Sequence, residues 1–181
     1  MARVELLDVG QMQPDLQNVF RKMEGNGYDV LNIYKALAHA PDLCLAFMRL
    51  GNKVLFKSRI DPKLRELAIL RVSRLTKARY EREQHESIAR DLGMDELQID
   101  AVKKWQGSRH FDKHEQTVLQ YTDELTGQVR AKNSTYKKLQ AFLSEREIVE
   151  LTVTVGFYNM VSRVLEALEV DLDDARFKVR N

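Results

Sequence analysis

The stretch that decides the fold is 62–76, PKLRELAILRVSRLT, a predicted helix that begins at Asp61 and Pro62. Apolar residues occur almost all round this helix at 100° per residue, so we expect it to be largely buried. Arg71 then lies in the middle of one apolar face, and Glu66 lies on the far side. Buried charges are usually paired or functional, so these two residues mark either a site or a structural ion pair or interface arginine.

The next predicted helix, 79–92, also carries charges on its inward face. Glu81 and His85 are four residues apart and can contact each other, and Ile88 and Leu92 share their face. A carboxylate beside an imidazole raises the pKa of the histidine and orients the ring, which suits general acid–base chemistry. The alternative is an ordinary surface pair, because the helix also carries Arg79, Arg82, Glu83 and Glu86.

The rest of the chain shows the same helical period. Helices are expected over 13–24, 29–39, 42–57, 62–76, 79–92, 95–105, 112–128, 134–142 and 145–169. Residues 149–155 are rich in β-branched side chains, which leaves a strand open, but the apolar pattern continues to Leu168 and favours a helix. We therefore predict an all-α fold in one domain spanning 1–181.

Composition narrows the classes of function. The chain has 181 residues, 44% hydrophobic and 31% charged, with a net charge of +2 and one cysteine, Cys44. This balance gives no reason to expect nucleic acid or membrane as a partner, and one cysteine excludes an intrachain disulfide and a CxxC redox pair. The uncharged run 151–162 is shorter than the ~20 residues that span a bilayer. We expect a soluble cytoplasmic protein.

Other candidate residues are weaker. His110 and His114 are four residues apart, but no third ligand is near them in sequence, so no metal site is predicted. Trp105 is expected to be a core or interface anchor. Tyr158 could line a pocket, although packing is the simpler role, and Cys44 fits a core position.

Two segments resemble a known family. They are Arg65–Arg71, RELAILR, and Ala78–His85, ARYEREQH, and together they look like the core of the carboxymuconolactone decarboxylase family, which includes the alkylhydroperoxidase D proteins. The resemblance extends over about residues 29–170. It implies a multihelical alkylhydroperoxidase D-like fold, assembly as a homotrimer or homohexamer, and a site between the helices that carry Glu66 and His85.

The resemblance also indicates which branch of the family applies. Aligned on His85, the two cysteine positions of the peroxidase branch are Ala78 and Glu81, and Tyr80 replaces a histidine. A dithiol must be oxidised and reduced again to turn over peroxide, so peroxidase activity is disfavoured. What remains resembles the decarboxylase-like branch, which acts on small carboxylated lactones and needs no metal, thiol or other cofactor.

The resemblance to that branch implies roles for individual residues. His85 is the predicted acid–base catalyst, with Glu66 as its partner or as a second proton carrier. Arg71 is the predicted anchor of a substrate carboxylate, and Tyr80 and Glu81 are expected to shape or polarise the pocket. Glu81 adds negative charge where an anionic substrate would bind, so a dicarboxylate is not expected.

Two alternatives stay open. The first is a thiol peroxidase that uses Cys44, with the pair of cysteines supplied by two subunits. The second is a non-catalytic helical oligomer that binds a small molecule, which a ligand would stabilise without any product being formed.

Overall fold

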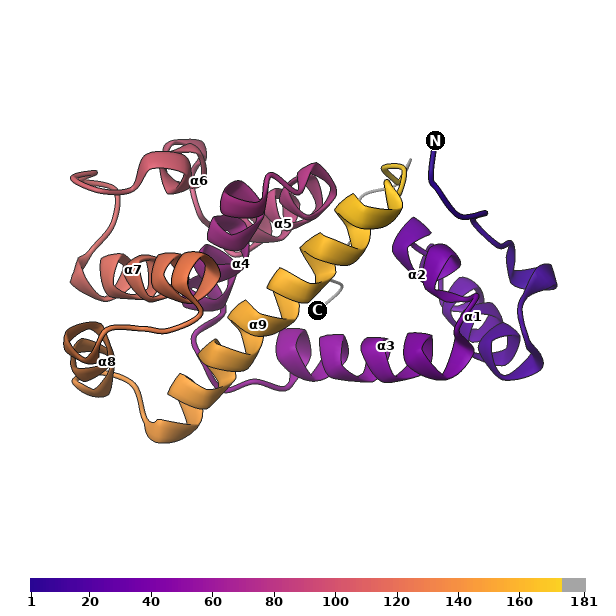
Figure 1. Cartoon of the computed structure of the whole chain (residues 1–181), viewed down its shortest axis with the longest axis horizontal. Helices are drawn as coiled ribbons and strands as arrows, with labels where there is room; N and C mark the ends of the chain where they lie inside the picture. Colours follow the sequence, from indigo (N-terminus) through magenta and orange to yellow (C-terminus); the bar gives the residue numbers. More distant parts are fainter. Residues whose placement is uncertain (174–181) are drawn as a thin grey trace.

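The computed structural model describes residues 1–173, and this part of the chain is helical without a strand. The prediction of an all-α fold is confirmed. The elements are η1 (Val9–Gln11), α1 (Pro14–Gly25), α2 (Asn32–Leu37), α3 (Pro41–Phe56), α4 (Pro62–Thr76), α5 (Arg79–Asp91), α6 (Glu96–Ala101), η2 (Val102–Lys104), α7 (Lys113–Gln128), α8 (Asn133–Gln140) and α9 (Glu145–Leu168). In Figure 1, α1 to α3 lie at one end, α6 to α8 at the other, and α9 runs diagonally between them.

Helix α4 is the central element and packs against α5, α7 and α9. Its N-terminus is fixed by Asp61, whose side chain accepts hydrogen bonds from the backbone N–H groups of Lys63 and Leu64, at 2.8 and 3.1 Å. Every residue from 65 to 73 is buried, as the apolar pattern on all sides predicted. Glu66 and Arg71 are therefore in the interior, and so is Arg65.

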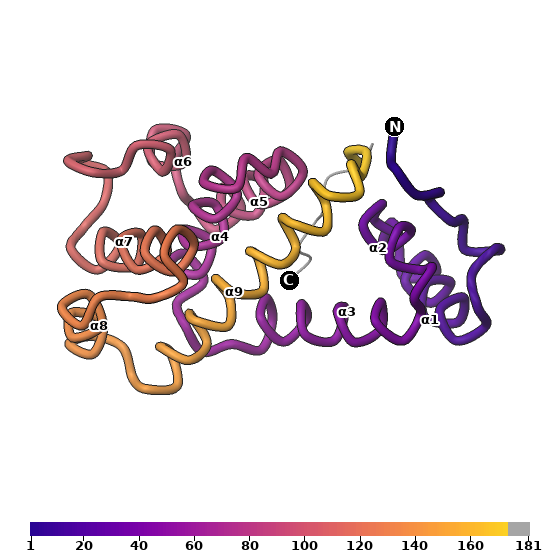
Figure 2. The backbone as a smooth tube through the Cα atoms, in the orientation of Figure 1, coloured from indigo at the N-terminus to yellow at the C-terminus, as the bar shows by residue number. Residues whose placement is uncertain are grey.

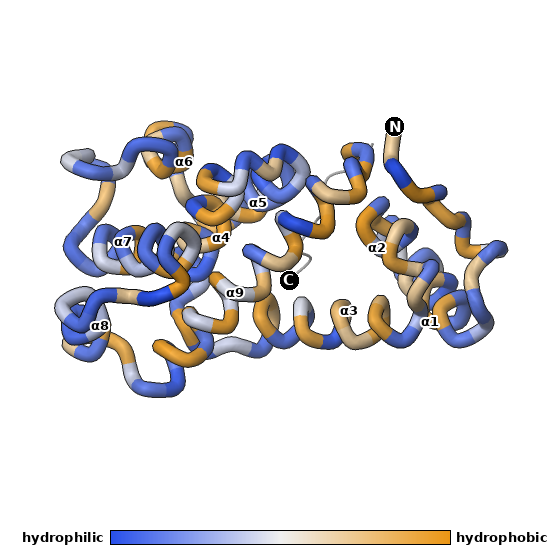
Figure 3. Tube along the Cα trace, viewed as in Figure 1, coloured by the Kyte–Doolittle hydropathy of each residue, from blue (hydrophilic) through white to orange (hydrophobic). Residues whose placement is uncertain are grey.

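Helix α9 is the long helix that packs against α4. Ser144 and Glu147 form the capping box that begins it, and the helix continues through the β-branched residues 149–155, so the strand alternative is wrong. Figure 3 shows hydrophobic residues recurring along α9 between polar ones. By length and composition α9 could cross a membrane, but half of its apolar window is buried in the fold, as in the core helix of a soluble protein.

The first three helices add a second layer of packing. Helix α2 is shorter than the predicted 29–39, because residues 28–31 are not helical and residues 38–39 form a turn. Cys44 is buried with Phe20 and Met48 between α1 and α3, in the core position predicted for it. The amino-terminal segment returns to the end of α9, where the N–H of Arg3 donates to the carbonyl of Leu168 at 2.8 Å (Figure 2).

Candidate active site

The structure brings Glu66 of α4 and His85 of α5 into contact. Glu66 Oε2 lies 2.6 Å from His85 Nδ1, and both side chains are buried. The second oxygen of Glu66 accepts a hydrogen bond from Arg65 Nε at 3.2 Å. A charged neighbour on each side therefore holds the Glu66 carboxylate in place, and the carboxylate in turn orients the imidazole ring.

The opposite edge of the His85 ring contacts residues of α5 and α9. His85 Nε2 lies 3.4 Å from Glu81 Oε2, one helical turn earlier, and the His85 ring packs edge-on against Tyr158 of α9, with centroids 4.8 Å apart. The Glu81 oxygen is buried and has no hydrogen bond in the described part of the chain, so its contact with His85 is electrostatic. Helix α5 thus turns Glu81 and His85 inward, and they do not form an ordinary surface pair.

This arrangement changes the protonation of His85. Burial alone would lower its pKa, but the charge and hydrogen bond of Glu66, with a smaller contribution from Glu81, raise the pKa from 6.5 to about 9. At neutral pH His85 is therefore an imidazolium whose Nδ1–H donates to Glu66. Its Nε2–H is left on the side of Glu81, so the ring can give up a proton there.

His85 opens onto a cavity of about 520 Å³ between α2, α3, α5 and α9. Most of the wall is apolar or aromatic, including Tyr34, Phe47 and Phe157. Two lining residues are acidic, Asp29 and Glu81, and no described residue of the wall is a lysine or an arginine. The cavity can hold a small, largely apolar molecule, and His85 is the side chain in its wall that carries positive charge.

Tyr80 also lines this cavity, as predicted for a pocket residue. Its hydroxyl donates a hydrogen bond to Asp173, which also accepts from Gln84 Nε2 at 3.1 Å and from the N–H of Asn32 at 2.6 Å. Burial and the nearby Asp173 carboxylate raise the pKa of Tyr80, so the phenol stays protonated and remains a donor.

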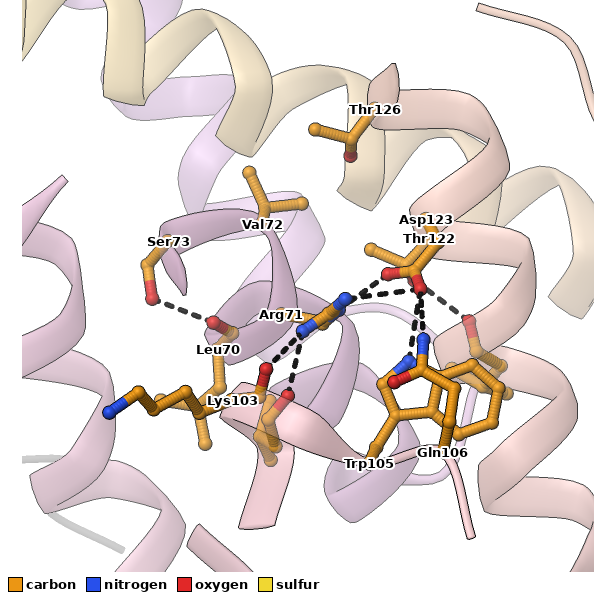
Figure 4. A network of polar contacts seen from close by, with 12 residues as sticks. Leu70, Arg71, Val72, Ser73, Lys103, Trp105, Gln106, Thr122, Asp123 and Thr126 are labelled. Atoms are coloured by element: carbon orange, nitrogen blue, oxygen red, sulfur yellow. Dashed lines mark hydrogen bonds and ion pairs between the residues drawn. The ribbon is translucent and has the colours of Figure 1, made fainter. Parts of the chain in front are cut away.

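Arg71 lies in a different network, on the side of α4 that faces α7 and η2 (Figure 4). Its guanidinium forms an ion pair with Asp123, and its Nη1 donates to the carbonyls of Val102 and Lys103, both at 2.9 Å. Trp105 also donates to Asp123, at 3.0 Å. Arg71 is not in the cavity wall and the structure does not bring it together with His85, so its predicted contact with substrate gains no support.

The remaining candidates are not drawn into the site. His114 stacks on Phe142, with ring centroids 4.0 Å apart, and no cluster of three metal-ligating side chains exists within residues 1–173. Cys44 is outside the cavity wall, and burial raises the pKa of its thiol to about 11. At neutral pH this cysteine is a thiol and not the nucleophilic thiolate.

Sequence reasoning missed two contributors to the site. Asp173 follows the end of α9, and no periodicity in the sequence relates it to Tyr80, 93 residues earlier. Tyr34 of α2 also lines the cavity, and its only sequence signal is that it is an aromatic residue in a short amphipathic helix. Tyr158 was assigned to packing, and the structure shows that it both packs on His85 and lines the cavity.

Solved structures share the fold. A peroxidase-related protein with an alkylhydroperoxidase AhpD core from Ralstonia eutropha JMP134 aligns with a TM-score of 0.81 and 16% identity, covering 96% of this chain and 93% of that one. A peroxidase-related protein from Silicibacter sp. TM1040 aligns with a TM-score of 0.80 and 20% identity, covering 96% and 92%.

A third similar structure is an enzyme with a bound ligand. The debrominase Bmp8, in a cysteine-to-alanine variant bound to 2,3,4-tribromopyrrole, aligns with a TM-score of 0.75 and 20% identity, covering 89% of this chain and 87% of that one. A search of curated proteins finds no match. The model of the carboxymuconolactone decarboxylase family matches residues 41–124, which include Glu66, Glu81 and His85. The similarity to the carboxymuconolactone decarboxylase family therefore rests on this segment, and the fold of the chain is similar to that of the AhpD-like proteins.

Proposed function

We propose that this chain is a cofactor-independent lyase that removes carbon dioxide from a small carboxylated lactone or a related aromatic-catabolism intermediate. The observation that carries the proposal is His85, held as an imidazolium by Glu66 at the wall of a largely apolar cavity. Such a group can deliver a proton to carbon without a metal or a thiol. The low polarity of the wall strengthens its electrostatic effect on a developing negative charge.

The reaction can be written with this chain's own residues. The carbon–carbon bond to the substrate carboxylate breaks, carbon dioxide leaves, and the electron pair is delocalised into a conjugated carbonyl group of the substrate. The positive charge of His85 stabilises the resulting enolate, and the Nε2–H is transferred to carbon. The imidazole then takes a proton from water, and Glu66 keeps the ring in the same orientation throughout.

Peroxide reduction is a weaker proposal for this site. It needs a pair of thiols near His85, but the matching positions are Ala78 and Glu81, and Cys44 is a buried thiol outside the cavity wall. Hydroperoxide reduction that disappears in Cys44→Ser would overturn this assignment in favour of a thiol peroxidase.

The test is a screen for turnover. Carboxylated lactones, β-keto acids and hydroperoxides are offered to the wild type, to His85→Gln and to His114→Gln, which makes the same substitution in a histidine stacked on Phe142. We expect release of carbon dioxide from one class of acid, about 100-fold slower in His85→Gln and unchanged in His114→Gln. Equal turnover by wild type and His85→Gln would refute the proposed role. Thermal stabilisation by the acids without product would instead indicate a non-catalytic binding protein.

Two further expectations remain proposals, the first implied by the family resemblance and the second by the composition. They are assembly as a homotrimer or homohexamer and a cytoplasmic location. Sedimentation velocity on the purified chain would test the first directly, and the lyase proposal does not depend on either.

A further inference from the structure

The end of the described chain places a carboxylate at the edge of the cavity. Asp173 Oδ1 accepts from the N–H of Asn32 at 2.6 Å, and Oδ2 accepts from Gln84 Nε2 at 3.1 Å and from the hydroxyl of Tyr80. Tyr80 and Gln84 line the same cavity as Glu81 and His85. Three donors from α2 and α5 thus converge on one carboxylate beside the candidate catalytic group.

The backbone brings this carboxylate to the cavity from outside. The segment 169–173 leaves the end of α9 and is fastened at the surface, where Asn32 Nδ2 donates to the carbonyls of Asp171 and Leu172 at 3.2 and 3.1 Å. The Glu169 side chain forms an ion pair with Arg3 at 2.7 Å. Asp173 itself is half-buried, and hydrogen bonds from three groups hold its side chain in this position.

Apart from His85, the described wall of the cavity supplies no cationic side chain to hold a carboxylated substrate. No described wall residue is a lysine or an arginine, and Arg71 is committed to Asp123 and two carbonyl groups. Hydrogen bonds from N–H and O–H groups to an ionised carboxylate are among the strongest in proteins. The three donors around Asp173 are therefore the part of the cavity that is built to receive a carboxylate.

We propose that Tyr80, Gln84 and the N–H of Asn32 form the binding site for the substrate carboxylate, and that Asp173 occupies this site when no ligand is bound. The inference rests on the proposed function, because it names the group by which that substrate is held. Binding replaces one carboxylate by another, so the cavity gains no net charge and Glu81 meets no charge that was not already present.

The position of this site suits the reaction. Tyr80 and Gln84 are four residues apart on α5. Glu81 and His85 have the same spacing and follow them by one residue, so the two pairs lie side by side on the helix. A ligand whose carboxylate is held by the first pair has its adjoining carbon atoms beside the second. His85 can then reach the carbon that loses carbon dioxide.

An occupant attached to the chain competes strongly with a ligand in solution. A tethered group acts at an effective concentration in about the millimolar range, which weakens the apparent affinity for any external carboxylate. Removing the Asp173 carboxylate should therefore tighten carboxylate binding and leave the binding of neutral ligands unchanged.

Calorimetric titration with benzoate and with benzamide, its neutral counterpart, tests this at neutral pH. We expect Asp173→Ala to bind benzoate about tenfold more tightly than the wild type, with benzamide unchanged. The matched control is Asp29→Ala, which removes an exposed carboxylate from the same cavity wall without removing the acceptor of the three donors. Equal gains in Asp173→Ala and Asp29→Ala would overturn the proposal, because the effect would then be one of charge alone.

Two more variants provide further checks of the proposal. Adding Tyr80→Phe to Asp173→Ala should return benzoate binding to the wild-type level, and an undiminished gain would refute the role of the phenol. If Asp173→Ala does not fold, Asp173→Asn keeps the shape but places an amide against the donors, and a gain for benzoate is still expected. No gain in this variant would count against the proposal.

The proposed carboxylate-binding site and the proposed lyase activity can be refuted independently of each other. Tighter benzoate binding in Asp173→Ala, with no turnover of any acid by the wild type, would support the carboxylate site and refute the lyase. Turnover by the wild type, with the same KM for carboxylated substrates and the same benzoate affinity in Asp173→Ala, would support the lyase and refute the site.

Discussion

Among the buried charged residues of helix α4, Glu66 and Arg71 have very different surroundings. Arg71 uses its donors on Asp123 and on two backbone carbonyls, and Asp123 is further bound by Trp105 and Gln106. The cluster of Glu66, Glu81 and His85 sets two carboxylates against one imidazole, with Arg65 on the second oxygen of Glu66. One Glu81 oxygen in it is buried without a hydrogen bond in the described structure.

The difference separates a structural ion pair from a candidate acid–base site. A buried ion pair whose donors are matched gains little from any change in protonation, and breaking it leaves an uncompensated charge. A buried imidazole beside two carboxylates has a strongly shifted pKa, and shifts of this kind, at the wall of a cavity, are typical of acid–base sites. The predictions below test whether the two clusters are as different as their contacts indicate.

The largest difference is expected between Glu66→Gln and Asp123→Asn, which make the same chemical change in the two clusters. Glu66→Gln removes the charge that keeps His85 protonated, so turnover should fall about 100-fold, as in His85→Gln. Asp123→Asn should lower stability and leave kcat of the folded protein within about twofold. Both are measured with the acid found in the substrate screen, after correction for the folded fraction.

A readout independent of turnover sharpens this comparison. In Glu66→Gln burial becomes the dominant influence, and the pKa of His85 should fall below 6.5, which NMR titration of the imidazole nitrogens detects. In Asp123→Asn the same titration should match the wild type. A similar loss of kcat in both variants would show that the two clusters do not differ in role.

The second prediction concerns stability. Arg71→Met removes the cation but keeps an apolar side chain of similar length, leaving Asp123 and the carbonyls of Val102 and Lys103 without it. We expect the free energy of unfolding to fall by about 3–5 kcal/mol in urea titrations. A fall below about 1 kcal/mol would show that Arg71 is not a structural residue and would reopen its predicted role with substrate.

The sequence predicted one cluster better than the other for a physical reason. Glu81 and His85 are on one helix, where a spacing of four residues nearly fixes their contact. The burial of Glu66 and Arg71 followed from the apolar sides of α4. The partner of Arg71 did not, because Asp123 is 52 residues away on α7, whose rotation against α4 is decided by packing that the pattern within α4 does not contain.

The carboxylate of Asp173 was beyond prediction for a similar reason. It reaches Tyr80 because the chain turns back after α9 and is fastened by Asn32, and neither contact has a periodic signature in the sequence. The helices themselves were predicted closely, since caps such as Asp61 and Ser144 and the apolar period are local features.

The third prediction is a dependence of stability on pH that only the Glu66 cluster should confer. The pKa of His85 is about 9 in the folded chain, above the usual 6.5, so protonation favours folding. This contribution is complete below about pH 6.5 and is lost as the pH rises through about 9, for a total of about 3 kcal/mol. Urea unfolding across this range measures it.

The control for this dependence is His85→Gln, which cannot take up the proton. Its free energy of unfolding should change much less between about pH 6.5 and pH 9. Arg71→Met should be less stable than the wild type but should keep the same slope, because the substitution leaves His85 and its two carboxylates in place. An equal slope in wild type and His85→Gln would contradict the assignment of the shift to His85.

The smallest effect is expected from Glu81→Gln. Glu81 acts on His85 at 3.4 Å without a hydrogen bond in the described structure, whereas Glu66 acts at 2.6 Å with one, so Glu81 contributes less to the pKa of His85. We expect this pKa to fall by about one pH unit, to a value still above 6.5, with about 1 kcal/mol less stability at neutral pH. NMR titration of His85 measures the shift. Because Glu66 alone would then still orient and protonate the ring, Glu81→Gln should keep most of the turnover, while a loss as large as that of Glu66→Gln would place Glu81 among the groups that handle the proton.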